Sequence, residues 1–342
     1  MYAYKNKKLE EYIMATAYEV IAVSAQLTIQ GTDVRVRTAP VSGIVLKSLN
    51  TGDAVQAVAR TLIDGEPWFA INGGWVSGRY VQGWVKDNDD NNCWWYVEKN
   101  YTYPKSEWRN IAGANYCFGP DGYLFVYCYI KSEVSGTYYW VDDDGVWQDG
   151  YDTTTPEKNY RIVENYKTEN AYRGGALPFT YSGNVQLTKS QMKVNAQYIL
   201  DYLKKKGWTK NAVCGMLGNM ETESHINPGR WQSGYSENDM DAGFGLVQWT
   251  PASKYFDWAQ DENLPVVYMD SELKRILHEV ETTGLQYIPT SKYNLTFSEF
   301  TKSTESAYYL GCAFLHNYER PADSSQDETR GNQATAWFNS LS

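Results

Sequence analysis

Residues 209–224 read TKNAVCGMLGNMETES, and this stretch predicts an amphipathic helix. Thr209 is a favourable N-cap, because its hydroxyl can accept a hydrogen bond from the first turn. The INPG sequence at 226–229 ends the helix, since proline cannot continue it. Stepping about 100° per residue gathers five apolar side chains on one face, those of Ala212, Val213, Met216, Leu217 and Met220. We therefore expect this helix to lie against a core.

Two glutamates lie in the last turn of the helix. Glu223 falls at the edge of the apolar face, whereas Glu221 falls about 140° from Met216, toward solvent. The negative end of the helix dipole and the apolar surroundings both disfavour a carboxylate, so both favour the protonated form of Glu223. A protonated carboxylic acid is what glycoside hydrolysis needs to protonate a leaving sugar oxygen. The alternative is an ordinary glutamate at the edge of an amphipathic helix.

Six motifs follow one another around this helix. They are VNAQYI at 194–199, GWTK at 207–210, CGMLGNMETES at 214–224, INPG at 226–229, GFGLVQWTP at 243–251 and YERP at 318–321. In this order they resemble the phage tail lysozyme family, over residues 188–342. The resemblance implies a lysozyme-like fold, mainly helical with some strand, and cleavage of the β-1,4 bond between N-acetylmuramic acid and N-acetylglucosamine. It also implies that Glu223, which follows the Gly-Asn-Met motif, is the catalytic acid.

A second carboxylate is expected just beyond the helix. A lysozyme-like fold would place a β-hairpin there, facing the acid across the sugar, and a partner ~5–9.5 Å away would act as nucleophile, base or charge stabiliser. Asp241, the nearest carboxylate to the glycines that follow, is the predicted partner. The alternative is a solvated loop carboxylate, with Glu223 then working beside a polar group that holds water. The predicted substrate contacts are Gly243, Gly245, Gln248, Trp249, Trp231 and Tyr235.

Residues 23–90 have a different pattern, rich in Val, Thr and Gly, with turn signals about every ten residues. That spacing predicts a small all-β barrel or sandwich. VRVRTAP at 34–40, LNTGD at 49–53 and GWV at 83–85 resemble a bacterial SH3-type domain. The resemblance implies a barrel that binds peptides of the cell wall, with Trp68 and Trp84 as contacts. A spacer barrel without a ligand is the alternative.

Residues 93–155 contain two copies of the pattern G-x-x-Y-x-x-x-x-D-G, which begin at Gly113 and Gly136. Each Asp-Gly pair predicts a hairpin turn, and each copy predicts a short aromatic hairpin that must stack on its neighbour. The copies resemble the choline- or glucan-binding repeats of cell-wall proteins, although Lys131 stands in the second copy where Trp108 stands in the first. The implied wall contacts are Trp108, Tyr116, Tyr139 and Trp140. The alternative is that these aromatic residues form the core of a β unit. Residues 156–187 are predicted to be a linker, or else an irregular strand region.

Composition excludes several classes of partner. The net charge of -10 argues against nucleic acid, because phosphate binding needs a basic surface. No run of 18 apolar residues occurs, so no membrane span is expected. Aromatic residues make up 15% of the chain, which suits stacking on sugars. The predicted partner is therefore peptidoglycan, with wall teichoic acid or choline as further ligands.

The five cysteines include no CxxC pair, and the three histidines form no HExxH motif. We therefore expect no metal site and no cofactor. Cys214 supplies an alternative function, a cysteine peptidase or amidase of peptidoglycan, although its neighbours are apolar. A second alternative is a non-catalytic wall-binding adhesin or tail protein, against which the retention of Glu223 speaks.

Delivery is inferred from the N-terminal residues. Glu10, Glu11 and Glu19 lie in or beside the half-apolar stretch 12–25, so no secretory signal is expected. This fits a lysin made in the host cytoplasm that is released through a holin, or one that is carried on the virion. Two binding modules beside one catalytic domain favour the first route, an endolysin. The sequence leaves open whether the product is a hydrolysed or an anhydro sugar.

Overall fold

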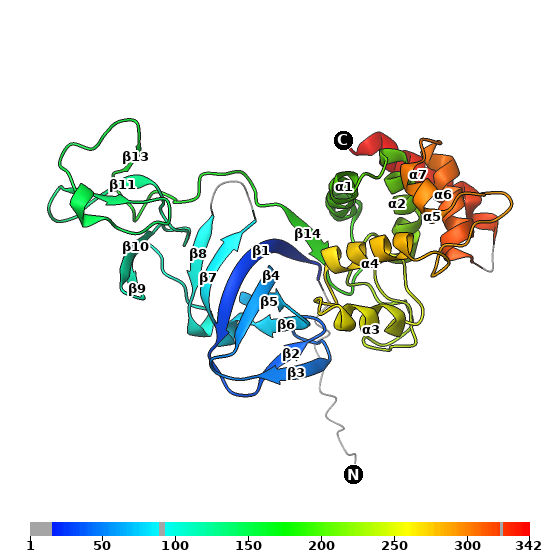
Figure 1. Ribbon diagram of the computed structural model, residues 1–342, viewed down its shortest axis with the longest axis horizontal. Coiled ribbons are helices and arrows are strands. Elements are labelled where there is room, and N and C mark those ends of the chain that lie inside the picture. The colour runs from blue at the N-terminus through cyan, green and yellow to red at the C-terminus, as the bar shows by residue number, and fades with distance from the viewer. Residues whose placement is uncertain (1–15, 89–92, 322–323) are drawn as a thin grey trace, which may run out of the picture.

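The computed structural model describes residues 16–88, 93–321 and 324–342. Part of the N-terminal stretch on which the signal prediction depends, up to residue 15, lies outside these ranges. A region made mostly of strands is followed by a helical region, as predicted (Figure 1). The strands of the main sheet are β1 (Tyr18–Ile29), β2 (Val34–Arg37), β3 (Val45–Leu49), β4 (Ala54–Ile63), β5 (Glu66–Ile71), β6 (Gly74–Ser77), β7 (Val81–Asp87), β8 (Trp94–Val97) and β14 (Phe179–Ser182).

The main sheet is a curved, open path of strands in the order β3-β2-β6-β5-β4-β1-β7-β8. Its inner face carries alternate apolar side chains, such as Leu27, Ile29 and Val36, which are completely buried. This alternation is the period of a strand with one face on a core. In the described residues no ladder joins β3 to β8, so the closed SH3-like barrel that we expected is not seen, although the region is all-β as predicted.

Two smaller sheets follow. Strands β9 (Glu107–Ile111) and β10 (Ala114–Phe118) form a hairpin, and β12 (Tyr138–Val141), β11 (Cys128–Lys131) and β13 (Arg161–Val163) form a three-stranded sheet. The two Asp-Gly turns have matching bonds: Gly122 N donates to Gly119 O, and Gly145 N donates to Asp142 O, each at 3.0 Å. Gly122 and Gly145 have φ of +81° and +77°, which is the left-handed region that favours glycine. The two turns therefore have the same geometry.

The stretch 156–187, predicted to be a linker or an irregular strand region, contributes two strands. β13 pairs in parallel with β11, and β14 pairs with the first residues of β1. β14 also contacts the helical region: Tyr181 N donates to Asn195 Oδ1 at 2.6 Å, and Asn195 Nδ2 donates back to Tyr181 O at 2.8 Å. Just beyond β14, Asn227 Nδ2 donates to Gly183 O and Val185 O. The segment is therefore a hydrogen-bonded connection between the two regions.

The helices are α1 (Lys189–Lys205), α2 (Lys210–Ser224), α3 (Ser253–Asp261), α4 (Met269–Glu281), α5 (Phe297–Lys302), α6 (Ala307–Phe314) and α7 (Asp327–Ser340), with a π-helical turn η4 (Leu315–Glu319) after α6. Short 3-10 turns are η1 (Gly78–Tyr80), η2 (Lys99–Tyr101), η3 (Asp149–Tyr151) and η5 (Ser324–Gln326). Helix α1 begins with a capping box, in which Thr188 and Gln191 exchange hydrogen bonds. In the described ranges no helix has the length and apolarity needed to cross a bilayer.

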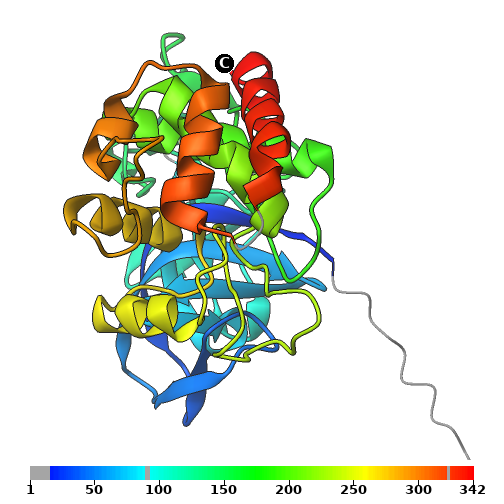
Figure 2. The same ribbon diagram turned by 90° about the vertical axis from the view of Figure 1, so that its right-hand side faces the viewer.

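Helices α2, α6 and α7 approach closely at glycines, and Figure 2 shows α6 and α7 side by side in orange and red. A Cβ at Gly218 of α2 would lie 2.6 Å from the Arg330 carbonyl oxygen of α7. A Cβ at Gly215 would lie 2.7 Å from Leu310 of α6. Both are closer than real Cβ contacts, so only glycine allows the helices to pack at this distance.

We expect Gly218→Ala to destabilise the protein by about 1–3 kcal/mol, because the methyl group must push the α7 backbone away. This loss outweighs the ~1 kcal/mol that alanine contributes to helix propensity. Urea denaturation followed by circular dichroism measures the change. Gly175→Ala is the matched control, since a Cβ there meets nothing within 4 Å. Equal stability of the two variants would contradict the packing argument.

Candidate functional site

The predicted helix around the candidate acid is confirmed as α2. Thr209 caps it, accepting a hydrogen bond from Ala212 N at 3.1 Å. The helix ends at Ser224, and His225 follows in the left-handed conformation with φ 58°. Glu223 thus occupies the last turn, where its side chain stays 23% exposed. A carboxyl group in this position can reach a ligand without leaving the helix.

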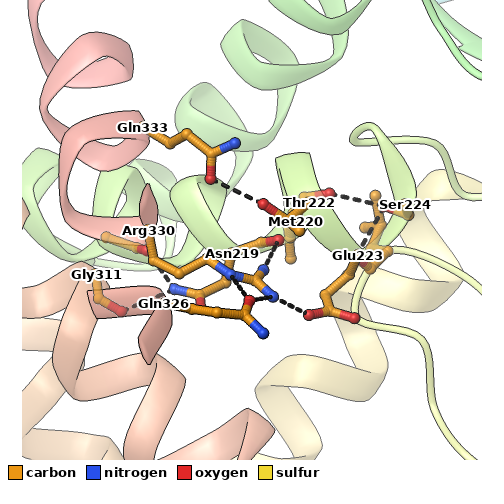
Figure 3. Close-up of polar contacts among 11 residues, drawn as sticks. Asn219, Met220, Thr222, Glu223, Ser224, Gly311, Gln326, Arg330 and Gln333 are labelled. Carbon is orange, nitrogen blue, oxygen red and sulfur yellow. Dashed lines mark hydrogen bonds and ion pairs between the residues drawn. The ribbon is translucent and has the colours of Figure 1, made fainter. Parts of the chain in front are cut away.

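Arg330 of α7 is the partner of Glu223 (Figure 3). Its Nη2 donates to Glu223 Oε1 at 2.6 Å, and its side chain is only 3% exposed. Arg330 Nη1 donates to Asn219 O at 2.7 Å, and Gln326 Oε1 accepts from Nε and Nη2. A buried guanidinium fixed on three sides holds its charge in one place. Glu223 therefore faces a fixed positive charge on one side and solvent on the other.

Glu319, at the end of η4, is a second carboxyl group close enough to interact with this pair. It is half-buried, and its Oε1 accepts no hydrogen bond from the described part of the chain. Burial raises the pKa of Glu319 well above its ordinary value, and the negative charge of Glu223 raises it further, whereas Arg330 lowers it. The charges of Glu223 and Arg330 therefore act on the Glu319 carboxyl group in opposite directions.

A buried hydrogen-bond network lies behind Glu319. Glu279 of α4 accepts from Trp249 Nε1 at 2.9 Å, from Arg275 Nε at 2.9 Å and from the Tyr318 hydroxyl. Tyr318 and Trp249 are 1% and 4% exposed. Because Tyr318 precedes Glu319, this network fixes the position of the second carboxyl group. The charge of Glu279 also adds to the effects that raise the pKa of Glu319.

The GFGLVQWTP loop, residues 243–251, lies at the end of α2. Ser224 Oγ donates to Leu246 O at 2.9 Å, and Leu246 N donates to Glu272 Oε2 at 2.7 Å. Gly245 has φ +79°, and a Cβ there would lie 2.7 Å from the Glu272 carboxyl group. Gln248 Nε2 donates to the Arg230 and Gly245 carbonyl oxygens, so its amide fixes the loop. The structure thus brings this loop beside Glu223, as the motif order suggested.

The predicted substrate contacts divide by exposure. Asp241 and Tyr235 are exposed, and Gly243 N is bound to Gln232 Oε1 at 2.8 Å. Trp231 and Trp249 are core residues, because Trp231 packs on Phe244 and Trp249 stacks on Tyr255 with ring centroids 4.8 Å apart. Both indoles, predicted as substrate contacts, are therefore buried, with 5% and 4% of their surface exposed. No described contact joins Asp241 to Glu223.

Glu221 differs from its prediction. We expected it to face solvent, but its side chain is 16% exposed and binds Lys189 of α1 at 2.7 Å. The helical wheel treated α2 as a helix with one covered face, whereas α1, α6 and α7 cover it on several sides. Glu223 stays more exposed than Glu221 because it lies nearer the free end of the helix.

The predicted wall contacts lie in two places. Trp68 is almost completely buried. Trp84 of β7 is half-buried and lies against Tyr116 of β10, with centroids 4.8 Å apart. Trp108 lies edge-on to Tyr139 at 5.8 Å. Trp140 packs against three tyrosines, Tyr129 of β11 and Tyr127 and Tyr160, which directly precede β11 and β13. The aromatic residues of 93–155 therefore pack on one another and leave partly exposed edges.

Cys214 is not placed for nucleophilic chemistry. It is completely buried in the core around α2, and burial raises the pKa of its thiol to about 12. The reactive thiolate is therefore scarce at neutral pH. Within the described ranges, no group of three or more His, Cys, Asp or Glu side chains is arranged to hold a metal ion.

Two residues of the cluster escaped the sequence analysis. Glu319 belongs to the YERP motif at 318–321, which marked the position without assigning it a role. Arg330 lies 107 residues after Glu223, and no local pattern singles it out. Arg330 is followed by Gly331, but this pair indicates a buried arginine only once the packing of the helices is known.

Comparison with known proteins shows a family match within the helical region. Residues 194–341 match the family model of phage tail lysozymes. The chain is also 57% identical over 161 residues to Morphogenesis protein 1 of Bacillus phage B103. That match covers 47% of this chain and 43% of the relative, so the chain spans less than half the length of the curated relative that it matches. The predicted resemblance to phage tail lysozymes is therefore confirmed for this segment.

We expect Glu319→Gln to flatten the dependence of stability on pH. A carboxyl group whose folded pKa is raised stabilises the fold below its unfolded value of 4.5, and this contribution is lost as pH rises toward the folded value. Between pH 5 and 8 the melting temperature of the wild type should therefore fall by about 2 °C more than that of the variant. Glu262→Gln, an exposed glutamate of equal charge, is the control and should follow the wild type. Parallel curves for all three proteins would show that Glu319 is already ionised.

Proposed function

We propose that this protein is a glycosidase of the bacterial cell wall that cleaves the β-1,4 bond between N-acetylmuramic acid and N-acetylglucosamine. The observation that carries the proposal is the carboxyl group of Glu223, solvent-accessible at the end of α2 and bound to the buried Arg330. The match of residues 194–341 to phage tail lysozymes supports the same activity. Glu223 is the proposed general acid.

The cluster suggests how the proton moves. In the proposed step Glu223 donates a proton to the leaving glycosidic oxygen as the bond from that oxygen to the anomeric carbon breaks. Glu223 is then a carboxylate, and the Arg330 guanidinium, 2.6 Å away, stabilises that negative charge. The negative charge of Glu223 raises the pKa of Glu319, because two carboxylates beside one guanidinium repel each other.

Asp241 is the proposed second carboxylate. It is exposed and lies two residues before Gly243, where the loop beside Glu223 begins. Its backbone N–H donates to Asp239 Oδ1 at 3.1 Å, so a turn fixes the backbone while the side chain remains in solvent. A carboxylate in this position could stabilise positive charge on the sugar or orient a water molecule. The same loop supplies Gln248 and the backbone of Gly243 and Gly245 as proposed sugar contacts.

The β region is the proposed wall-binding part, with an SH3-like module and a repeat of aromatic hairpins. Trp84, Tyr116, Trp108, Tyr139 and Trp140 keep partly exposed edges that suit contact with sugars. Trp68 is covered and contributes to the core instead. Wall teichoic acid and choline remain proposed additional ligands of this region.

A phage origin is the proposed setting. The relative named Morphogenesis protein 1 comes from a Bacillus phage, and a protein named for morphogenesis supports a virion-associated enzyme. The alternative is an endolysin made in the host cytoplasm and released through a holin. The buried thiol of Cys214 disfavours a cysteine peptidase.

We expect Glu223→Gln to lower the release of reducing sugars from purified peptidoglycan by roughly 10²–10⁴-fold, because the general acid is lost while the side-chain shape is kept. Glu221→Gln, two residues away in the same helical turn, is the matched control and should retain activity. Melting curves of both variants check that they are folded. Undiminished sugar release by Glu223→Gln would refute the glycosidase assignment, and release of free amino groups that depends on Cys214 would establish the peptidase alternative.

We expect Asp241→Asn to lower the same activity by about 100-fold or more if the side chain stabilises charge on the sugar. Glu237→Gln, an exposed carboxylate of the same loop, is the control and should keep nearly full activity. Equal activity of both variants would remove Asp241 from the site and leave Glu223 with a water-binding polar partner.

A further inference from the structure

A cavity of about 710 Å³ lies on the outer face of the main sheet, far along the chain from Glu223. Its floor consists of side chains from four neighbouring strands, β4, β1, β7 and β8, and one wall is the turn between β9 and β10 at Ile111 and Ala112. The cavity therefore lies between the main sheet and the first aromatic hairpin.

The strand register arranges the floor in a row. Gln56 lies opposite Gln26 across β4 and β1, and Trp84 lies opposite Tyr96 across β7 and β8. Because Thr28 pairs with Gln82 and Ser24 with Lys86, Gln26 and Trp84 are adjacent on the same face. The outward positions of the sheet thus form a strip in which two amides are followed by two aromatic rings.

The chemistry of this strip is polar and uncharged. Four of the lining side chains are glutamines, at positions 26, 30, 56 and 82, and none of the described lining residues carries a charge. A glutamine offers a carbonyl acceptor and two N–H donors, so it can bind both hydroxyl and N-acetyl groups. Indole and phenol rings beside it supply flat apolar faces. This combination matches the alternating polar edges and apolar faces of a pyranose chain.

The aromatic side of the cavity is fixed before any ligand arrives. Trp84 lies edge-on to Tyr96 at 5.0 Å and stacks on Phe118 of β10 at 6.0 Å. Gln82 Nε2 donates to the Tyr96 hydroxyl at 3.1 Å. Side chains held in one rotamer lose little entropy on binding, which favours affinity. The hairpin β9–β10 therefore contributes to the cavity by holding Trp84 as well as by forming a wall.

We propose that this cavity binds the glycan strand of peptidoglycan. The inference rests on the proposed function, which it deepens by assigning the wall contact to sugar. A polyanionic teichoic acid would need basic side chains, and stem peptides with free carboxylates would need them as well, but the described lining residues include none. A choline group would need an aromatic cage with several ring faces around one point, whereas the three rings here, Trp84, Trp94 and Tyr96, all project from one face of two neighbouring strands.

The test measures co-sedimentation with sacculi from which teichoic acids and other secondary polymers have been stripped. All proteins carry Glu223→Gln, so that the sacculi stay intact. Adding Gln26→Ala and Gln56→Ala, at two exposed positions, should weaken the apparent Kd by about tenfold, since two hydrogen bonds are lost. The matched control adds Gln186→Ala and Gln260→Ala, two exposed glutamines outside the cavity, and should bind like the parent.

Soluble competitors identify the ligand. A β-1,4-linked N-acetylglucosamine oligomer should displace the parent and the control, whereas a stem peptide should not. Equal binding by the cavity variant and the control would overturn the proposal. Displacement by the stem peptide, or binding that disappears when the secondary polymers are stripped, would overturn it as well. Co-sedimentation and competition measure binding alone. The glycosidase assignment is tested by sugar release from the wild type and from Glu223→Gln, so a failure of one proposal can be told from a failure of the other.

Discussion

The close approach of α2, α6 and α7 is the constraint on which the candidate site depends. Gly215 and Gly218 let α6 and α7 lie against α2 at distances that a Cβ would prevent. At that distance Arg330 of α7 reaches both the Asn219 carbonyl and the Glu223 carboxyl group of α2. A guanidinium that is 3% exposed must have its charge compensated, so the packing and the ion pair stabilise each other. The charge of the site is thus set by helix packing.

Charge balance explains why this site contains a second glutamate. With Arg330 alone, Glu223 would be held as a carboxylate, the form that a general acid has after the reaction. Glu319 adds a competing carboxyl group whose pKa is raised by burial and by Glu223. The charges of Glu223 and Arg330 thus act on Glu319 in opposite directions, and the guanidinium would stabilise a carboxylate at Glu223. If Glu223 is the acid that we propose, the three groups together would bear on both of its charge states.

Local patterns could be read from the sequence, whereas long-range partners could not. The cap at Thr209 and the INPG motif gave the bounds of α2, and the periodicity placed Glu223 near a core. Burial of Trp249 and of Glu221 depends on α4 and α1, which the helical wheel omits. The alternation of 23–90 indicated strands but not their pairing, so the open path of the sheet was not predicted. Residues 156–187 are polar, and they form strands because β11 and the first residues of β1, which β7 does not reach, offer free edges.

The connection through β14 bears on how a wall-binding region would assist a glycosidase. A flexible linker raises the effective concentration of an enzyme at its substrate without fixing its orientation. Here β14 pairs with β1 while Asn195 and Asn227 bind its backbone and the residues that follow it, and Trp75 Nε1 donates to Val267 O at 3.2 Å. The sheet is therefore fixed against the helical region. A glycan strand held on the sheet would approach Glu223 from a limited set of directions, so the binding region would select which bonds reach the acid.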